Sequence, residues 1–118
     1  MIHNYRRKLG QKGEEVAAEY LQQKGYKIAA LNFTTRVGEI DIIARSQEEI
    51  IFVEVKTAVS NKFGPPQYAV DKEKQQKIRK VAAQYLSLQR DYECCRFDVI
   101  TLTGDEDDLA VEHIPAAF

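Results

Sequence analysis

The stretch "GEIDIIARSQEEIIFVEVKT", residues 38–57, decides the fold of this chain. It holds two runs rich in Ile, Val and Phe on either side of a short polar segment, Ser46 to Glu49. This pattern is typical of two β-strands joined by a tight turn. Both runs also carry charge where a sheet is normally apolar, at Glu39, Asp41, Glu54 and Lys56. These charges are the first indication of a functional site.

The turn predicts how the two strands pair. If Arg45 and Ile50 flank a four-residue loop, alternating side chains form two faces. One face is then wholly apolar and carries the pairs Ala44–Ile51, Ile42–Val53 and Ile40–Val55. The other face carries the pairs Ile43–Phe52, Asp41–Glu54 and Glu39–Lys56. The charges are therefore expected on one side of the hairpin.

Asp41 and Glu54 would repel each other in this pairing, because directly opposed residues have Cβ atoms roughly 4.5–5.5 Å apart. A divalent cation would remove the conflict, and carboxylate oxygens are the ligands that Mg²⁺ and Mn²⁺ prefer. Lys56 points to the same face as Glu54 and could reach a phosphate or a metal-bound water. The alternative is a solvated sheet face on which Lys56 bridges Glu39 and Glu54 and Asp41 is simply exposed.

The rest of the chain predicts a mixed α/β fold. We expect the order α-β-β-β-α-β-β, a mixed sheet with flanking helices. The second helix has an apolar stripe of Ile78, Val81, Ala82 and Tyr85. The remaining predicted elements are a helix over Gly10–Lys24, a strand over Lys27–Phe33, a loop over Ala58–Gln67, a helix over Asp71–Leu88, and strands over Arg96–Thr103 and Leu109–Ile114.

Length and composition narrow the class of protein. With 118 residues and 44% hydrophobic content, the chain is expected to form one domain over residues 1–118. It has no apolar run long enough for a membrane helix and no secretory signal pattern, so we expect a cytoplasmic protein without membrane contact. Cys94 and Cys95 are adjacent and are interpreted as reduced thiols. A net charge of −1 argues against polyanion binding by bulk electrostatics, so the lysine-rich second helix is either a local basic face or a solvated surface.

The spacing D-x(12)-E-x-K of Asp41, Glu54 and Lys56 resembles the signature of the restriction-endonuclease-like, or PD-(D/E)XK, nuclease superfamily. Further stretches resemble the YraN-like family of small bacterial predicted endonucleases, which is itself similar to the archaeal Holliday-junction resolvases. The resemblance runs from about Gly10 to Leu102 and implies a restriction-endonuclease-like fold. The stretches are "GQKGEEVAAEYLQQKGY" (10–26), "N-F-x-x-R-x-GEIDIIA" (32–44), "FVEVKT" (52–57), "FGPP" (63–66), "AVDKEK" (69–74) and "RFDVI" (96–100).

The resemblance implies roles for the matching residues. Asp41 and Glu54 would bind Mg²⁺ or Mn²⁺, with the backbone carbonyl of Val55 as a further ligand. Lys56 would orient or help to deprotonate the attacking water. Glu14 would act through a water or a second metal, although an acid near a helix N-terminus is also favourable without any catalytic role. Glu39 is expected either to contact the metal or to pair with Lys56.

Phosphate contacts are expected from the second helix, at Lys74, Lys77 and Lys80. The implied activity is hydrolysis of DNA phosphodiester bonds, on branched or structured DNA, by a homodimer. Arg96 and Asp98 are interpreted as a structural pair. The alternative is a nuclease-fold module without turnover that binds nucleic acid or a protein partner. Ala58 favours it, because relatives commonly carry an arginine there. An RNA substrate is not separable by sequence.

Overall fold

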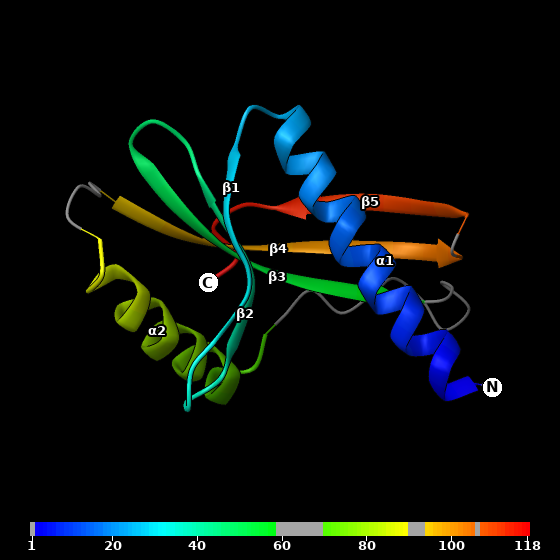
Figure 1. Cartoon of the computed structure of the whole chain (residues 1–118), viewed down its shortest axis with the longest axis horizontal. Coiled ribbons are helices and arrows are strands. Elements are labelled where there is room, and N and C mark those ends of the chain that lie inside the picture. The colour runs from blue at the N-terminus through cyan, green and yellow to red at the C-terminus, as the bar shows by residue number, and fades with distance from the viewer. Residues whose placement is uncertain (1, 59–69, 90–93, 106) are drawn as a thin grey trace.

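The computed structural model describes residues 2–58, 70–89, 94–105 and 107–118. These residues form two helices and five strands in the predicted order α-β-β-β-α-β-β, which confirms the fold class (Figure 1). The elements are α1 (Ile2–Gln23), β1 (Lys27–Thr34), β2 (Glu39–Arg45), β3 (Glu49–Ala58), α2 (Lys72–Leu86), β4 (Cys94–Asp105) and β5 (Asp108–Ile114). The predicted loop Ala58–Gln67 and the "FGPP" motif lie, from residue 59 on, outside the described residues.

The five strands form one mixed sheet in the order β1-β2-β3-β4-β5. Neighbouring strands are antiparallel except β3 and β4, which are parallel, and α2 belongs to the connection between those two. A parallel pair requires such a crossover, because its two strands run in the same direction. The β1–β2 hairpin runs steeply across the direction of β3, β4 and β5 in Figure 1, so the sheet is strongly twisted.

Both faces of the central strand β3 are covered. One core cluster packs under α2 and includes Ile43, Phe52 and Phe97, together with the four predicted stripe residues of that helix. The other packs under α1 and includes Leu21, Ile42, Val53 and Ile100. The prediction of the α2 stripe is therefore confirmed. The hairpin face that carries Ile43 and Phe52 is more fully covered than the sequence pattern indicated.

The predicted hairpin register is confirmed over only part of its length. Ile42 pairs with Val53, Ile43 with Phe52, Ala44 with Ile51 and Arg45 with Ile50. The ladder then ends, so the predicted pairs Asp41–Glu54, Ile40–Val55 and Glu39–Lys56 are wrong as ladder pairs. Asp41 Oδ2 instead accepts a hydrogen bond of 2.8 Å from the backbone N–H of Val55. Because a side chain takes this N–H, β2 leaves β3 at Asp41.

Ile40 shows the consequence of this departure. The period-two pattern predicts Ile40 on the same face as Ile42. In the structure Ile40 belongs to the cluster under α2, whereas Ile42 belongs to the cluster under α1. The first residues of β2 are therefore rotated relative to the remainder of the strand.

Helix α1 begins at Ile2, well before the predicted start at Gly10. Gly10 is therefore inside the helix, and Gly13, one turn later, is buried in it. A Cβ atom on Gly13 would overlap Thr57 Oγ1 and would lie 3.1 Å from Leu102 Cδ1. Gly13 is therefore required for the close approach of α1 to β3.

Gly13→Ala is expected to lower the free energy of unfolding by about 1–3 kcal/mol, because the added methyl group overlaps the β-branched side chain of Thr57. Gly10→Ala in the same helix is the matched control, since nothing lies within 4 Å of its Cβ position. That change should raise stability by about 0.5–1 kcal/mol through helix propensity. Urea denaturation of the two variants checks the prediction, and equal effects would contradict it.

A buried polar cluster holds the end of the sheet that contains Arg96 and Asp98. Arg96 donates from Nε and Nη2 to the two carboxylate oxygens of Asp98, at 2.7 and 2.8 Å. His113 Nε2 lies 2.7 Å from Asp98 Oδ2, and the N–H of Ala116 donates to Oδ1 at 3.0 Å. The predicted structural pair is confirmed, and it also ties β4 to the residues that follow β5.

None of the helices among the described residues has both the length and the apolar character needed to span a membrane.

Candidate active site

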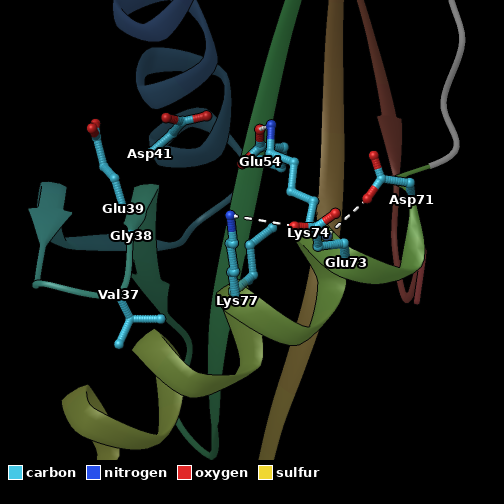
Figure 2. Close-up of a pocket in the computed structure, with 10 residues that line it drawn as sticks. Val37, Gly38, Glu39, Asp41, Glu54, Asp71, Glu73, Lys74 and Lys77 are labelled. Atoms are coloured by element: carbon cyan, nitrogen blue, oxygen red, sulfur yellow. Dashed lines mark hydrogen bonds and ion pairs between the residues drawn. The ribbon is translucent and has the colours of Figure 1, made fainter.

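The departure of β2 from β3 opens a cavity of about 560 Å³ between the first residues of β2, the middle of β3 and the start of α2. Carboxylates enter it from the strands, Lys74 extends toward Glu54 from α2, and Lys77 lies beside Glu73 of the same helix (Figure 2). The cavity therefore places cationic and anionic groups on facing elements. Its lining consists of Val37, Gly38, Glu39, Asp41, Glu54, Asp71, Glu73, Lys74, Lys77 and Ile78.

Asp41 is the most strongly perturbed carboxyl group of this cavity. Burial, followed by the charge of Glu54, raises the pKa of Asp41 to about 7, and the charges of Glu14 and Glu39 add to the rise. The hydrogen bond from the N–H of Val55 acts in the opposite direction. Although Asp41 and Glu54 are not ladder partners, they repel each other as the sequence pattern indicated.

The raised pKa of Asp41 predicts a pH dependence of stability in a chelator. The group titrates near 3.8 when unfolded and near 7 when folded, so the folded state holds the extra proton between those values. The contribution of protonated Asp41 to the free energy of unfolding is fully present below about pH 4 and is lost as the pH rises toward 7. The difference in free energy of unfolding between Asp41→Asn and the unchanged protein should therefore shift in favour of the variant by about 4 kcal/mol from pH 4 to pH 8. Denaturant titrations across this range measure that difference, and a flat profile would contradict the prediction.

Glu54 lies deeper in the cavity, with 8% of its surface exposed. Its Oε1 forms an ion pair with Lys74 Nζ. Burial alone would lower the pKa of Lys74, but the hydrogen bond and charge of Glu54 outweigh it and raise that pKa. Asp71 caps α2 and accepts a 2.8 Å hydrogen bond from the N–H of Lys74, so the start of the helix also orients this lysine.

Glu14 and Glu39 form a second pair of carboxylates near Asp41. With its amide oriented to satisfy its neighbours, Asn32 donates to Glu39 Oε1 at 2.8 Å and to Glu14 Oε2 at 3.2 Å. Burial raises the pKa of Glu14, against the bond from Asn32, and the charges of Glu39 and Glu54 raise it further. Because α1 begins at Ile2, Glu14 lies in mid-helix, and the proposed stabilisation at a helix N-terminus does not apply.

The remaining predicted residues occupy different positions. Lys56 is half-buried on β3 opposite Thr101 of β4, and it lies outside the cavity lining. Lys77 lines the cavity and lies 3.8 Å from Glu73. Lys80 is exposed on α2. The roles of these lysines and of the Val55 carbonyl as a metal ligand stay predictions.

Asn32 is the site residue to which the sequence analysis assigned no role, although it is the first residue of the motif over residues 32–44. Its backbone φ is 51°, in the left-handed region. Asn tolerates this conformation better than most residues, and an Asn inside a strand pattern is unusual. The Asn inside a strand pattern was therefore the signal available in the sequence. It could not identify the two carboxylates that Asn32 contacts, because they are distant in the sequence.

The carboxylates of Asp41 and Glu54 suit a Mg²⁺ or Mn²⁺ ion. Each keeps one oxygen outside the contacts described above, at Asp41 Oδ1 and Glu54 Oε2. Within residues 2–58, 70–89, 94–105 and 107–118, no group of three or more His, Cys, Asp or Glu side chains is arranged to hold a metal. An ion held by two carboxylates would complete its coordination with water or phosphate, which is the usual environment of Mg²⁺. A structural Zn²⁺ site, in contrast, needs four protein ligands.

These features define a mixed α/β protein with a partly buried acidic cavity lined by lysines from one helix. Residues 13–102 match the family described as "Uncharacterised protein family UPF0102". The chain belongs to this family. It is 49% identical over 118 residues to a UPF0102 protein of Geobacter metallireducens, covering 99% of this chain and 95% of the relative. It is 46% identical over 110 residues to one of Thermodesulfovibrio yellowstonii, covering 93% of this chain and 95% of the relative.

Proposed function

We propose that the protein is a nuclease that hydrolyses DNA phosphodiester bonds with Mg²⁺ or Mn²⁺ at the cavity between β2, β3 and α2. The observation that carries the proposal is the convergence of Asp41 and Glu54 where β2 leaves β3. Two carboxylates that repel each other in a partly buried cavity are stabilised by a divalent cation. The resemblance to the PD-(D/E)XK nucleases supports the same residues.

The residues proposed for the site have distinct roles, and one of them, Lys56, lies outside the cavity lining. Asp41 and Glu54 would hold the cation, which would supply an acidic water and neutralise charge on the phosphate. Lys56 orients the attacking water. Lys74 would donate to a phosphate oxygen, and Lys77 would contact the neighbouring phosphate.

Branched or structured DNA is the proposed substrate. A chain of 118 residues has little surface for reading a long base sequence, so recognition by shape is favoured. The lysines of α2 would supply affinity that does not depend on sequence. A homodimer, a cytoplasmic location and a single domain complete the proposal, and they rest on the resemblance and the composition.

Cleavage of a labelled substrate panel tests the proposal. The panel contains a four-way junction, a flap, single-stranded DNA, linear duplex DNA and matched RNA, each with Mg²⁺ and with Mn²⁺. We expect the junction or flap DNA to be cut, and cutting to be lost in both Glu54→Ala and Lys56→Ala. Cutting that persists in folded variants would identify a contaminating nuclease, and preferential cutting of RNA would overturn the proposed substrate.

The second candidate function is a nuclease-fold module that binds nucleic acid or a protein partner without turnover. The ion pair between Lys74 and Glu54 favours it, because a lysine already neutralises one carboxylate of the site. Ala58, at the end of β3, also lacks the charge of an arginine for contact with phosphate. Pure, folded protein that binds divalent metal and junction DNA but cuts nothing would support this candidate.

A further inference from the structure

Asn32 lies opposite Asp41 in the β1–β2 ladder. Leu31 pairs with Ile42 and Phe33 pairs with Ile40, so Asn32 occupies the register position facing Asp41. This is also the position at which Asn32 adopts its left-handed backbone, with φ of 51°. The unusual backbone of β1 is therefore level with the point where β2 leaves β3.

Both strands change face at this level. In a regular strand, residues two apart share a face and residues three apart do not. In β1, however, Ala30 and Phe33 both pack against the cluster under α2. In β2, Ile40 packs under α2 and Ile42 under α1. The two strands rotate together, and the left-handed backbone conformation of Asn32 in β1 permits the rotation.

The side chain of Asn32 joins two elements on either side of this rotation. Its amide nitrogen donates to Glu39 of β2 and to Glu14 of α1. These are two of the groups whose charges act on Asp41. Both N–H bonds of one amide are used to hold two like-charged carboxylates side by side, which would otherwise separate.

We propose that Asn32 is a positioning residue, which holds Glu14 and Glu39 together beside Asp41 and thereby shapes the metal site. The role of Asn32 toward the metal rests on the proposed metal-dependent function. The contact itself does not depend on that function. A purely conformational role for Asn32 makes a different prediction, because glycine adopts positive φ at least as readily as asparagine.

Asn32→Gly separates the two roles, since it keeps the left-handed backbone and removes the amide. If Asn32 positions the carboxylates, Mn²⁺ affinity measured by calorimetry should fall about tenfold, in the range seen when a supporting residue of a metal site is removed. In the Glu39→Gln background the same change should have a much smaller effect, because the glutamine amide can itself donate to Glu14. Wild-type affinity in Asn32→Gly would overturn the proposal.

A second measurement uses no metal and no substrate. In a chelator at pH 8, Asn32→Gly should lower the thermal midpoint, and Glu39→Gln should suppress that loss, because one of the repelling charges is gone. An unchanged midpoint, or an equal loss in both backgrounds, would overturn the contact. If the unchanged protein binds no Mn²⁺, the proposed function fails together with the role of Asn32 toward the metal, while the chelator experiment still decides whether Asn32 holds the two carboxylates.

Discussion

Glu54→Gln and Asp41→Asn are each expected to abolish tight binding of Mg²⁺ and Mn²⁺ and to lower DNA cleavage by at least about a hundredfold. Each change removes one anionic ligand and preserves the shape of the side chain. The amide oxygen introduced by Asp41→Asn can still accept the N–H of Val55, and that introduced by Glu54→Gln can still accept from Lys74. The fold should therefore survive.

Stability distinguishes this expectation from simple unfolding. Burial and the charge of Glu54 raise the pKa of Asp41, so Asp41→Asn should stabilise the metal-free protein at pH 8. Loss of metal binding in a more stable protein is a signature that a folding defect cannot produce. It is the expected result where a site keeps repelling groups for function.

Glu73→Gln is the matched control for both variants. Glu73 lines the same cavity, but it lies on the exposed first turn of α2 beside Lys77. Calorimetric titration with Mn²⁺ should give an affinity within about threefold of the unchanged protein, because a screened surface charge contributes little. Unchanged affinity in a folded double variant of Asp41 and Glu54 would refute the site.

Asp98→Ala is expected to give the largest loss of stability of any single change discussed for this protein, about 3–5 kcal/mol. Asp98 is fully buried and accepts hydrogen bonds from Arg96 and Ala116, with His113 at 2.7 Å. Its removal leaves the guanidinium of Arg96 without its principal partner. Urea denaturation measures the loss, and Asp107→Ala, at an exposed position, should change stability by less than about 0.5 kcal/mol.

The stabilisation by Asp98 should also depend on pH in the opposite sense to that of Asp41. Burial would raise the pKa of Asp98, but the hydrogen bonds from Arg96, Ala116 and His113 and the charge of Arg96 lower it. A carboxylate with a lowered folded pKa stabilises above its unfolded value near 3.8 and loses that contribution as the pH falls through the folded value. The difference between Asp98→Ala and the unchanged protein should therefore be constant near neutral pH and shrink in acid. A difference that grows toward low pH would contradict this account.

Local periodicity was sufficient to predict most of the fold. The four buried residues of α2 follow from helical spacing, and the pairs from Ile42–Val53 to Arg45–Ile50 follow from strand alternation and a four-residue turn. These features depend on residues close together in the chain, so one sequence contains them. Asp41 and Glu54 were identified for the same reason, because acid within an apolar strand conflicts with its surroundings.

The geometry of the site depends on contacts between distant segments. The carboxylate of Asp41 accepts a hydrogen bond from the N–H of Val55, and the β2–β3 ladder ends there. The cavity opens where the ladder ends. Glu54 forms an ion pair with Lys74, twenty residues later in the chain. Asn32 joins Glu14 to Glu39 across three elements. Spacing along the chain cannot specify such contacts, because they depend on how α1, α2 and the twisted hairpin pack against one another, and that packing is set by the burial of both faces of β3.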